Sequence, residues 1–341
     1  MNINELQSRI FAARGMGASD AAHLMSLGPS AVHIDRALTN CAVQYRNREY
    51  IADTCMPVVT VASRSDKIFE FPVQTMQQLA DVSLAGNRGM PGEVTYSLQS
   101  SLNYSVSDYA LMDFVSNDEI ANADAPLQPK IESVEVVTNY LHLARESRVA
   151  AKVFGSGNYG SNTAALSGAD RWDTATSDPI QKIEDAIESC FVRPTHIVLG
   201  AQVWTKLRNH PKFLQYILSR ASTAAGDVPL RVSEQLIADA FGLEGCVVGR
   251  AKYVTSVEGQ TATSGYLWGK SAALIRVEKT PSPRRTSCFG YTFRFGSFET
   301  REIVDNLRGV RGGVFEKVSH SDAETVIAGA NAGYLYTTVV S

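Results

Sequence analysis

Three glycines near the middle of the chain have the spacing of a dinucleotide-binding loop. Gly155, Gly157 and Gly160 form the pattern G-x-G-x-x-G, which in a nucleotide site follows a strand and opens a helix. Here a helical pattern precedes the glycines and a polar stretch follows them. The context therefore favours an ordinary loop. A soluble α/β nucleotide-binding enzyme stays open as an alternative, and it predicts that Gly157→Ala abolishes nucleotide binding.

A second segment, Gly269 to Ser271, resembles the end of a phosphate-binding P-loop. That motif needs another glycine five residues before Gly269, but Ser264 occupies the position and Gly265 is displaced by one. A strand-like run follows at 272–277, where a P-loop would open a helix. The segment therefore predicts a turn before a strand.

The histidines and cysteines lack the spacing of a metal or catalytic site. No H-E-x-x-H pair or G-x-S-x-G elbow occurs, and no two cysteines lie within five residues of each other. We therefore predict no catalytic residue, no metal site and no cofactor. The residues concerned are His23, His33, His142, His196, His210, His320, Cys41, Cys55, Cys190, Cys246 and Cys288.

Composition and charge narrow the class of protein. The 341 residues are 44% hydrophobic and 20% charged, with a formal net charge of -3. Such values are typical of a globular chain and exclude a generally basic nucleic-acid coat. The odd, scattered cysteines favour a reducing compartment. No apolar run approaches the roughly 20 residues that span a bilayer, so we expect no membrane partner.

The most distinctive pattern is a strict two-residue alternation over 94–106, which predicts a strand about 43 Å long. A shorter strand pattern at 68–73 and a turn-rich tip precede it, so the region predicts a projecting hairpin. A two-stranded arm is marginal alone, and we expect a neighbouring subunit to support it. The tip residues are Gly86, Asn87, Arg88, Gly89, Met90, Pro91 and Gly92, and the apolar strand positions are Val94, Tyr96, Leu98, Leu102, Tyr104 and Val106.

A long helix and an alternating α/β region follow. Apolar residues at three- and four-residue spacing predict a helix over 129–154, with an apolar face formed by Ile131, Val134, Val137, Leu141 and Ala144. A flexible loop is expected at 155–173. Helices alternate with short strands over 176–275, which predicts one central sheet. The expected strands are 195–199, 246–254 and 272–277, and strand patterns return over 288–341.

Charge is unevenly distributed along the chain. Residues 276–317 carry nine basic and five acidic side chains, whereas residues 113–135 carry six acids and one base, Lys130. Solvated faces explain such stretches. Complementary charge between subunits, or weak contacts to DNA phosphates, are the two functional interpretations.

The order of these elements resembles the major capsid proteins of tailed bacteriophages, which have the Hong Kong 97-type α+β fold. The resemblance implies an N-terminal arm at 1–64, an extended hairpin loop at 65–110 and an axial domain at 176–275. It places a peripheral domain at 111–175 and 276–341, with a spine helix at 129–154. The implied functional residues are Tyr45, Arg46, Arg48 and Tyr50 as arm contacts, and Leu141, Arg145 and Glu146 on the spine helix.

The resemblance implies a structural protein and not an enzyme. Hexamers and pentamers of the chain would tile an icosahedral shell around packaged double-stranded DNA, which they would touch only weakly and without sequence preference. The implied partners are further copies of the chain, a scaffolding protein, a portal protein and, where a phage has them, decoration proteins. The protein would be assembled in the bacterial cytoplasm and reside in the virion.

Two departures from relatives refine this expectation. Some relatives cross-link Lys to Asn between subunits, but here no lysine occurs between Lys67 and Lys130, so we expect no cross-link. Some relatives begin with a fused scaffolding segment, whereas little sequence precedes the arm here, so we expect a separate scaffolding protein. An encapsulin-type compartment shell, which shares the fold but encloses a cargo enzyme, is the first alternative.

Overall fold

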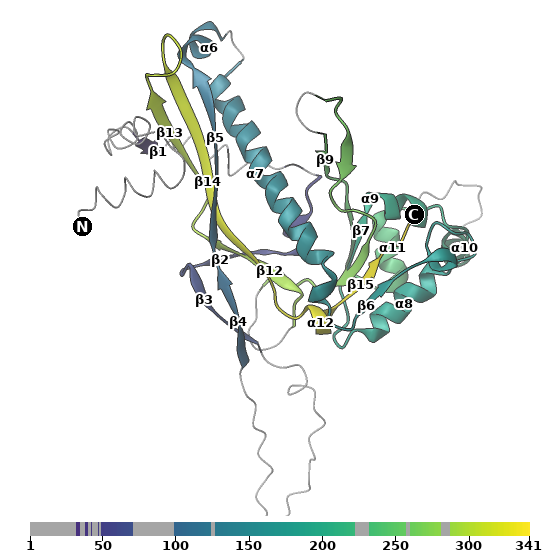
Figure 1. Cartoon of the computed structure of the whole chain (residues 1–341). Coiled ribbons are helices and arrows are strands. Elements are labelled where there is room, and N and C mark those ends of the chain that lie inside the picture. Colours follow the sequence, from purple (N-terminus) through teal and green to yellow (C-terminus); the bar gives the residue numbers. More distant parts are fainter. Residues whose placement is uncertain are drawn as a thin grey trace, which may run out of the picture. The chain divides into compact units, whose positions relative to one another are not determined.

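The computed structural model describes residues 32–34, 38–39, 42, 47, 49–70, 99–123, 127–221, 232–256, 260–280 and 287–341 (Figure 1). The chain forms two compact units, each assembled from three separate segments. The first unit comprises 1–46, 108–141 and 297–320, and the second comprises 47–107, 142–296 and 321–341. Helices and strands occur in both, as the α+β prediction requires.

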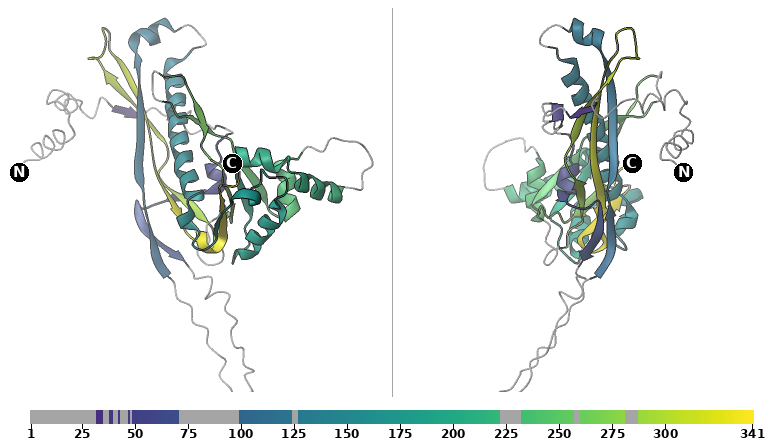
Figure 2. Two further views of the ribbon diagram at one scale, coloured as in Figure 1. Left: turned by 45° about the vertical axis from the view of Figure 1, so that its right-hand side comes forward. Right: turned by 90° about the vertical axis from the view of Figure 1, so that its left-hand side faces the viewer.

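The first unit is built on an antiparallel sheet. Strand β13 (Glu299–Asp305) pairs with β1 (Val32–Ile34) on one side and with the first part of β14 (Gly313–Val326) on the other. Strand β5 (Ser107–Ser116) also pairs with β14. These long strands run side by side in both sets of views (Figures 1 and 2).

Helix α7 (Pro129–Val153) confirms the predicted long helix, and its first half covers this sheet. Val134, Val137 and Leu141 are buried against Phe298 and Val318. The short helix α6 (Asn117–Asn122) precedes it and begins with a capping box, in which Ser116 and Glu119 exchange hydrogen bonds. The predicted periodicity therefore records real burial on this half of the helix.

The second unit contains a five-stranded sheet in the order β6, β15, β11, β7, β8. β11 pairs antiparallel with both β15 and β7, whereas β7–β8 and β15–β6 are parallel pairs. The strands are β6 (Thr163–Ala165), β7 (His196–Gly200), β8 (Gly245–Gly249), β11 (Ala272–Ile275) and β15 (Gly333–Thr337).

Both faces of this sheet are covered, because successive side chains point to opposite sides. Ile197 and Leu199 pack toward four helices, whereas Val198 packs toward the second half of α7 and Trp268. The four helices are α8 (Pro179–Ser189), α9 (Ala201–Leu207), α10 (Pro211–Ala221) and α11 (Glu234–Phe241). Helix α11 ends at Gly242, which adopts a left-handed conformation with φ 64°.

A second group of strands surrounds the short helix α4 (Ala52–Cys55) in the same unit. β2 (Val58–Val61) is parallel to β12 (Gly290–Phe295), which is antiparallel to the last part of β14. β3 (Ser65–Glu70) and β4 (Gln99–Ser105) form the base of the predicted hairpin. The remaining helix is α12 (Gly329–Ala332).

Two expectations differ from the structure. The loop at 155–173 contains β6 and two short 3-10 helices, Ser156–Asn158 and Gly168–Asp170. The strand expected over 246–254 is broken at Arg250, so β9 (Lys252–Val254) instead pairs with β10 (Ser264–Tyr266) in a separate ribbon.

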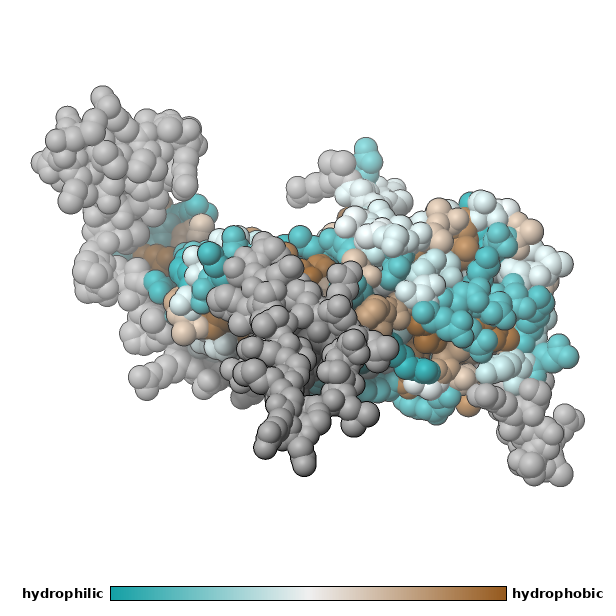
Figure 3. Space-filling view, turned by 90° about the horizontal axis from the view of Figure 1, so that it is seen from below, coloured by the Kyte–Doolittle hydropathy of each residue, from teal (hydrophilic) through white to brown (hydrophobic). Residues whose placement is uncertain are grey.

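No helix within the described ranges is both long and apolar enough to cross a membrane. Figure 3 shows one face of the molecule, on which hydrophobic residues occur in small groups between hydrophilic ones.

Close packing at Gly249 yields a stability prediction. A Cβ atom there would lie 2.1 Å from Cγ of the buried Trp268, whereas one at Gly157 would meet nothing within 4 Å. We expect Gly249→Ala to lower the free energy of unfolding by about 1–3 kcal/mol and Gly157→Ala to change it by less than about 0.5 kcal/mol. Urea unfolding of the unassembled subunit measures both. Equal midpoints for the two variants would contradict this packing.

Candidate functional site

The glycine motifs do not build phosphate sites. Gly155, Gly157 and Gly160 follow helix α7, and the structure that opens among them is a single 3-10 turn. Gly269, with φ 49°, turns the chain before strand β11. Among the described residues, no cluster of His, Cys, Asp and Glu could hold a metal ion. The structure thus confirms both loop interpretations.

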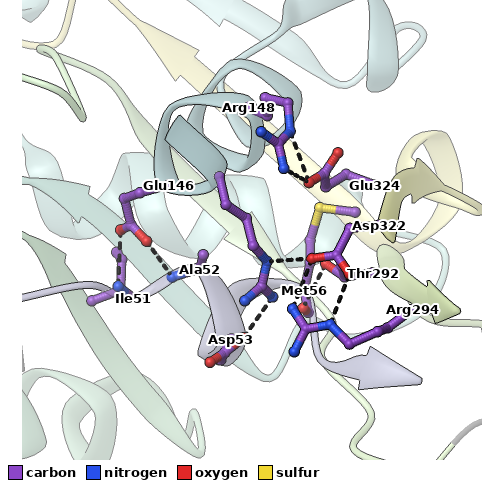
Figure 4. A network of polar contacts seen from close by, with 11 residues as sticks. Ile51, Ala52, Asp53, Met56, Glu146, Arg148, Thr292, Arg294, Asp322 and Glu324 are labelled. Atoms are coloured by element: carbon purple, nitrogen blue, oxygen red, sulfur yellow. Dashed lines mark hydrogen bonds and ion pairs between the residues drawn. The ribbon is translucent and has the colours of Figure 1, made fainter. Parts of the chain in front are cut away.

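The chemistry-bearing side chains that do converge form a buried network on helix α7 (Figure 4). Glu146 is fully buried and accepts hydrogen bonds from the backbone N–H groups of Ile51 and Ala52, at 2.8 and 2.9 Å. It also accepts one from Nε1 of Trp268 at 2.7 Å. One carboxylate therefore joins α7, the start of α4 and the segment between β10 and β11.

The local sequence explains why α4 needs this carboxylate. Helix starts leave N–H groups unsatisfied, and the N-cap residue Ile51 has no side chain that can accept them. Glu146 supplies a capping group from 95 residues away, where the helix dipole also favours negative charge. Burial raises the pKa of Glu146, and the hydrogen bonds from Ile51, Trp268 and Ala52 oppose that rise.

A second part of the network surrounds the neighbouring Arg145, which is also buried. Its Nη2 lies 2.5 Å from Oδ1 of Asp53 in α4, and its Nε lies 3.5 Å from Oδ2 of Asp322 in β14. Asp322 accepts two hydrogen bonds from Arg294 in β12, both at 2.7 Å. The Asp53 side chain is largely exposed, whereas Asp322 is buried, and removing one partner of a buried ion pair costs about 3–5 kcal/mol.

Two flanking contacts complete the anchor for the arm. Nη2 of Arg148 lies 2.9 Å from Oε1 of Glu324, and the Thr292 hydroxyl donates to the carbonyl of Met56 at 3.2 Å. The Arg148–Glu324 pair joins α7 to β14, whereas the Thr292–Met56 bond and the β2–β12 pairing hold residues 51–61 in place within the second unit. We call this set of contacts the arm anchor.

The base of the hairpin has an anchor of its own. Tyr104 is buried, stacks on Phe293 with ring centroids 4.6 Å apart, and donates its hydroxyl proton to the carbonyl of Ser63 at 3.1 Å. Leu102 and Val106 are half-buried on the same side, whereas Asn103 and Ser105 are exposed. The alternation predicted for this stretch is therefore confirmed within the described residues.

The predicted spine-helix residues divide between two environments. Leu141 belongs to the apolar core of the first unit, and Arg145 and Glu146 form the arm anchor. Ala144 is exposed, so the prediction that it continues the apolar face is wrong. The reason is that the second half of α7 buries the two charged residues, which find fixed partners. Tyr50 is half-buried against the core of the second unit.

Other predicted site residues fall outside the described part of the chain. They are Tyr45, Arg46, Arg48, Gly86, Asn87, Arg88, Gly89, Met90, Pro91, Gly92, Val94, Tyr96 and Leu98.

Sequence reasoning missed the partners of the network, namely Asp53, Trp268, Arg294, Asp322 and Glu324. A signal existed for the last three. Asp322 and Glu324 are two residues apart in a strand pattern, so they share a face. Arg294 alternates with aromatic residues in the same way, and the pairing of Arg294 with Asp322 brings the charges together.

Some charged residues of the acidic and basic stretches form ion pairs with each other within the first unit. Lys130 lies 2.9 Å from Glu302, and Arg311 lies 3.0 Å from Asp118. Some of these charged side chains therefore form ion pairs within the subunit. The sequence analysis had assigned them to solvent, to other subunits or to DNA.

The arrangement of elements is shared with phage proteins of known structure. The fold matches a phage-related protein of Bordetella bronchiseptica RB50 with a TM-score of 0.65, at 22% identity over 90% of this chain and 97% of that one. It also matches the capsid protein of cyanophage P-SCSP1u with a TM-score of 0.56, at 11% identity over 86% and 88% of the two chains. The predicted Hong Kong 97-type α+β fold is confirmed.

Sequence comparison identifies the family. Residues 157–287 match the model of phage major capsid protein E. The chain is 31% identical over 312 residues to the major capsid protein of Pseudomonas phage JBD67, covering 90% of this chain and 97% of that protein. It is 27% identical to that of Burkholderia phage BcepMu, covering 89% and 95%. The chain therefore belongs to the phage major capsid proteins and is a structural component of the phage head.

The arm anchor generates a first prediction for this site. In Glu146→Gln an amide group replaces one acceptor oxygen and faces an N–H donor. We expect the free energy of unfolding to fall by about 1–3 kcal/mol. Glu188→Gln, on the exposed face of α8, is the matched control and should change it by less than about 0.5 kcal/mol. Urea unfolding checks both, and equal losses in the two variants would contradict a specific role for Glu146.

His142, one turn before Glu146, generates a second prediction. Burial and the nearby charge of Arg145 lower its pKa from 6.5 to about 4. Because the unfolded chain binds this proton at higher pH than the folded one, stability is lost as the pH falls from 6.5 toward 4. The loss amounts to at most about 3 kcal/mol. Unfolding measured across this range should show a shallower loss for His142→Gln, and identical pH profiles would exclude His142 as the source.

Proposed function

We propose that the chain assembles as hexamers and pentamers into the icosahedral shell that encloses the double-stranded DNA of a tailed bacteriophage. The proposal places assembly in the host cytoplasm and gives the protein a structural role without catalysis. The observation that carries it is the pair of anchors on the second unit. Buried contacts hold the end of the arm and the base of the hairpin. A force that a neighbouring subunit exerts on either segment would therefore be transmitted to the core of the subunit.

We further propose that the hairpin, residues 65–110, lies over a neighbouring subunit and that the arm, residues 1–64, reaches a second one. Residues 176–275 form the axial domain in this scheme, and 111–175 with 276–341 form the peripheral domain. β6 and β15 of the five-stranded sheet come from the latter ranges. Several interfaces of roughly 1,600 Å² each around one subunit would make the lattice cooperative while single contacts stay reversible.

The proposed partners follow from the same role. A separate scaffolding protein would guide closure, a portal protein would occupy one vertex, and decoration proteins would bind the shell of a phage that has them. The net charge of -3 is consistent with weak contacts to packaged DNA, since strong binding needs many cationic side chains that each neutralise a phosphate.

Deleting residues 86–92 tests the role of the hairpin. We expect the variant to keep the wild-type circular dichroism spectrum and unfolding midpoint but to lose closed shells, because its contact to the neighbour is gone. Negative-stain microscopy and multi-angle light scattering measure the particles, with and without the neighbouring phage genes. Replacing the same seven residues by glycine and serine keeps the loop length as a control. Normal particles from the deletion would remove the hairpin from the assembly mechanism.

The single lysine near the hairpin allows a test for covalent cross-linking. Lys67 is exposed at the base of the hairpin, and we expect no covalent bond between subunits. Wild-type shells boiled in detergent should therefore migrate as a single 37.0 kDa band, and Lys67→Ala should leave both shells and band unchanged. A ladder of multimers that disappears in Lys67→Ala would contradict this expectation.

A further inference from the structure

Three basic side chains lie at one end of the five-stranded sheet, where β7 begins and β11 ends. Ile275, the last residue of β11, pairs with His196, the first residue of β7, so the segments that flank this pair lie beside each other. Arg193 precedes β7, and Arg276 and Lys279 follow β11. We call these three cations the basic sheet end.

Hydrogen bonds hold the two segments together and fix both arginines. The hydroxyl of Thr195 accepts from the backbone N–H of Val277 at 2.9 Å. Nη1 of Arg276 donates to the carbonyl of Arg193 at 3.2 Å, and Nη2 of Arg193 donates to the carbonyl of Phe241 at 3.0 Å. A guanidinium carries five N–H donors, so these bonds orient each arginine and leave other donors for a ligand.

The charge of the basic sheet end is not neutralised by ion pairs within the subunit. Across the described ranges, none of Arg193, Arg276 and Lys279 pairs with a carboxylate, although Arg193 and Lys279 are exposed and Arg276 is half-buried. Two arginines elsewhere in the same basic stretch, Arg294 and Arg301, do pair with acids. The basic sheet end therefore presents positive charge to whatever lies outside the subunit.

One acid faces this surface and a second one faces away from it. Burial lowers the pKa of His196, the charge of Glu244 opposes this shift, and that of Lys279 adds to it. The imidazole is therefore neutral at pH 7, with one acid and one cation near it. Burial raises the pKa of Tyr291 and the charge of Glu278 adds to that rise, which places Glu278 on the side of β12. Three cations thus outnumber the one nearby acid.

Packaged DNA fits this surface better than a neighbouring copy does. A neighbouring copy would have to offer acids without partners, but in the acidic stretch 113–135 Asp113 already accepts from Ser133 and Asp118 pairs with Arg311. A DNA duplex instead presents a phosphate charge about every 1.7 Å along its axis. Guanidinium groups also match the geometry of phosphate oxygens.

We propose that the basic sheet end binds phosphate groups of the packaged DNA and so belongs to the surface that faces the interior of the shell. Arg193 and Arg276 offer fixed N–H donors, and Lys279 offers an ammonium group on a flexible stem. Contacts to the backbone alone carry no sequence preference. Arg284 and Arg285 follow in the sequence but lie outside the described residues. The inference rests on the proposed shell, which brings subunits and DNA together.

The salt dependence of DNA binding tests the site in the unassembled subunit. Three phosphate contacts predict that the affinity for a short labelled duplex falls about 40-fold between 50 and 200 mM salt. Fluorescence anisotropy measures this fall. In Lys279→Ala it should shrink to about 12-fold, because one contact fewer lowers the slope of log affinity against log salt by about 0.9.

Two control variants separate this site from charge in general. Lys279→Arg keeps the charge, and Lys206→Ala removes an exposed charge from α9, so both should retain the fall of about 40-fold. All three variants should match wild type in circular dichroism. A fall in Lys279→Ala equal to that of wild type would overturn the proposal. Unchanged DNA binding together with a loss of shells would overturn it in favour of a contact between copies.

Chemical modification of assembled heads gives a second measurement. Lys279 should react more slowly with acetic anhydride in DNA-filled heads than in empty ones, because phosphate groups cover its ammonium group. Mass spectrometry measures the acetylated fraction. Equal rates in filled and empty heads would overturn the proposal and leave the shell in place. If wild-type protein forms no shells under any condition, the proposed function itself fails, which distinguishes that failure from loss of this site alone.

Discussion

One buried carboxylate organises the second unit of this protein. Glu146 brings together helix α7, the start of α4 and Trp268, three elements far apart in sequence. A buried negative charge is tolerated there because three donors surround it, and because the preceding residue of the helix, Arg145, adds a compensating charge. Without this interaction the first N–H groups of α4 would lose their acceptor.

The same logic explains why the two halves of α7 differ in character. The first half packs apolar residues against a sheet, as amphipathic helices usually do. The second half also buries apolar residues, Val149 and Val153, but adds a pair of charges with specific partners. Apolar packing tolerates small shifts, whereas hydrogen bonds to a buried charge define one geometry. A subunit that must place an arm accurately gains from the second kind of contact.

The elements that could be predicted from sequence are those whose periodicity reflects local burial. The helix at 129–154 and the alternation that ends at Val106 were predictable because their apolar residues recur with a fixed period. In the helix they recur about once per turn, and in the strand at every second residue, so they lie on one face. The link between Glu146 and Ile51 was not, since hydrogen-bond partners leave no periodic trace. β15 illustrates the same limit. Its strand pattern is clear, but a pattern does not name a neighbouring strand, and the segment pairs with β11 and β6. The break at Arg250, which separates β8 from β9, was missed although Gly249 and Arg250 interrupt the apolar run there.

The position of β15 in the five-stranded sheet has a consequence for biosynthesis. β15 lies between β6 and β11 but is translated after every other strand of that sheet. Until it emerges from the ribosome, β6 has no sheet partner and β11 lacks one of its two neighbours, so the sheet cannot close. Chains generally fold by domains as they are made, but this unit must wait for residues 333–337. Nascent chains are thereby kept from competing with finished subunits for places in a growing shell.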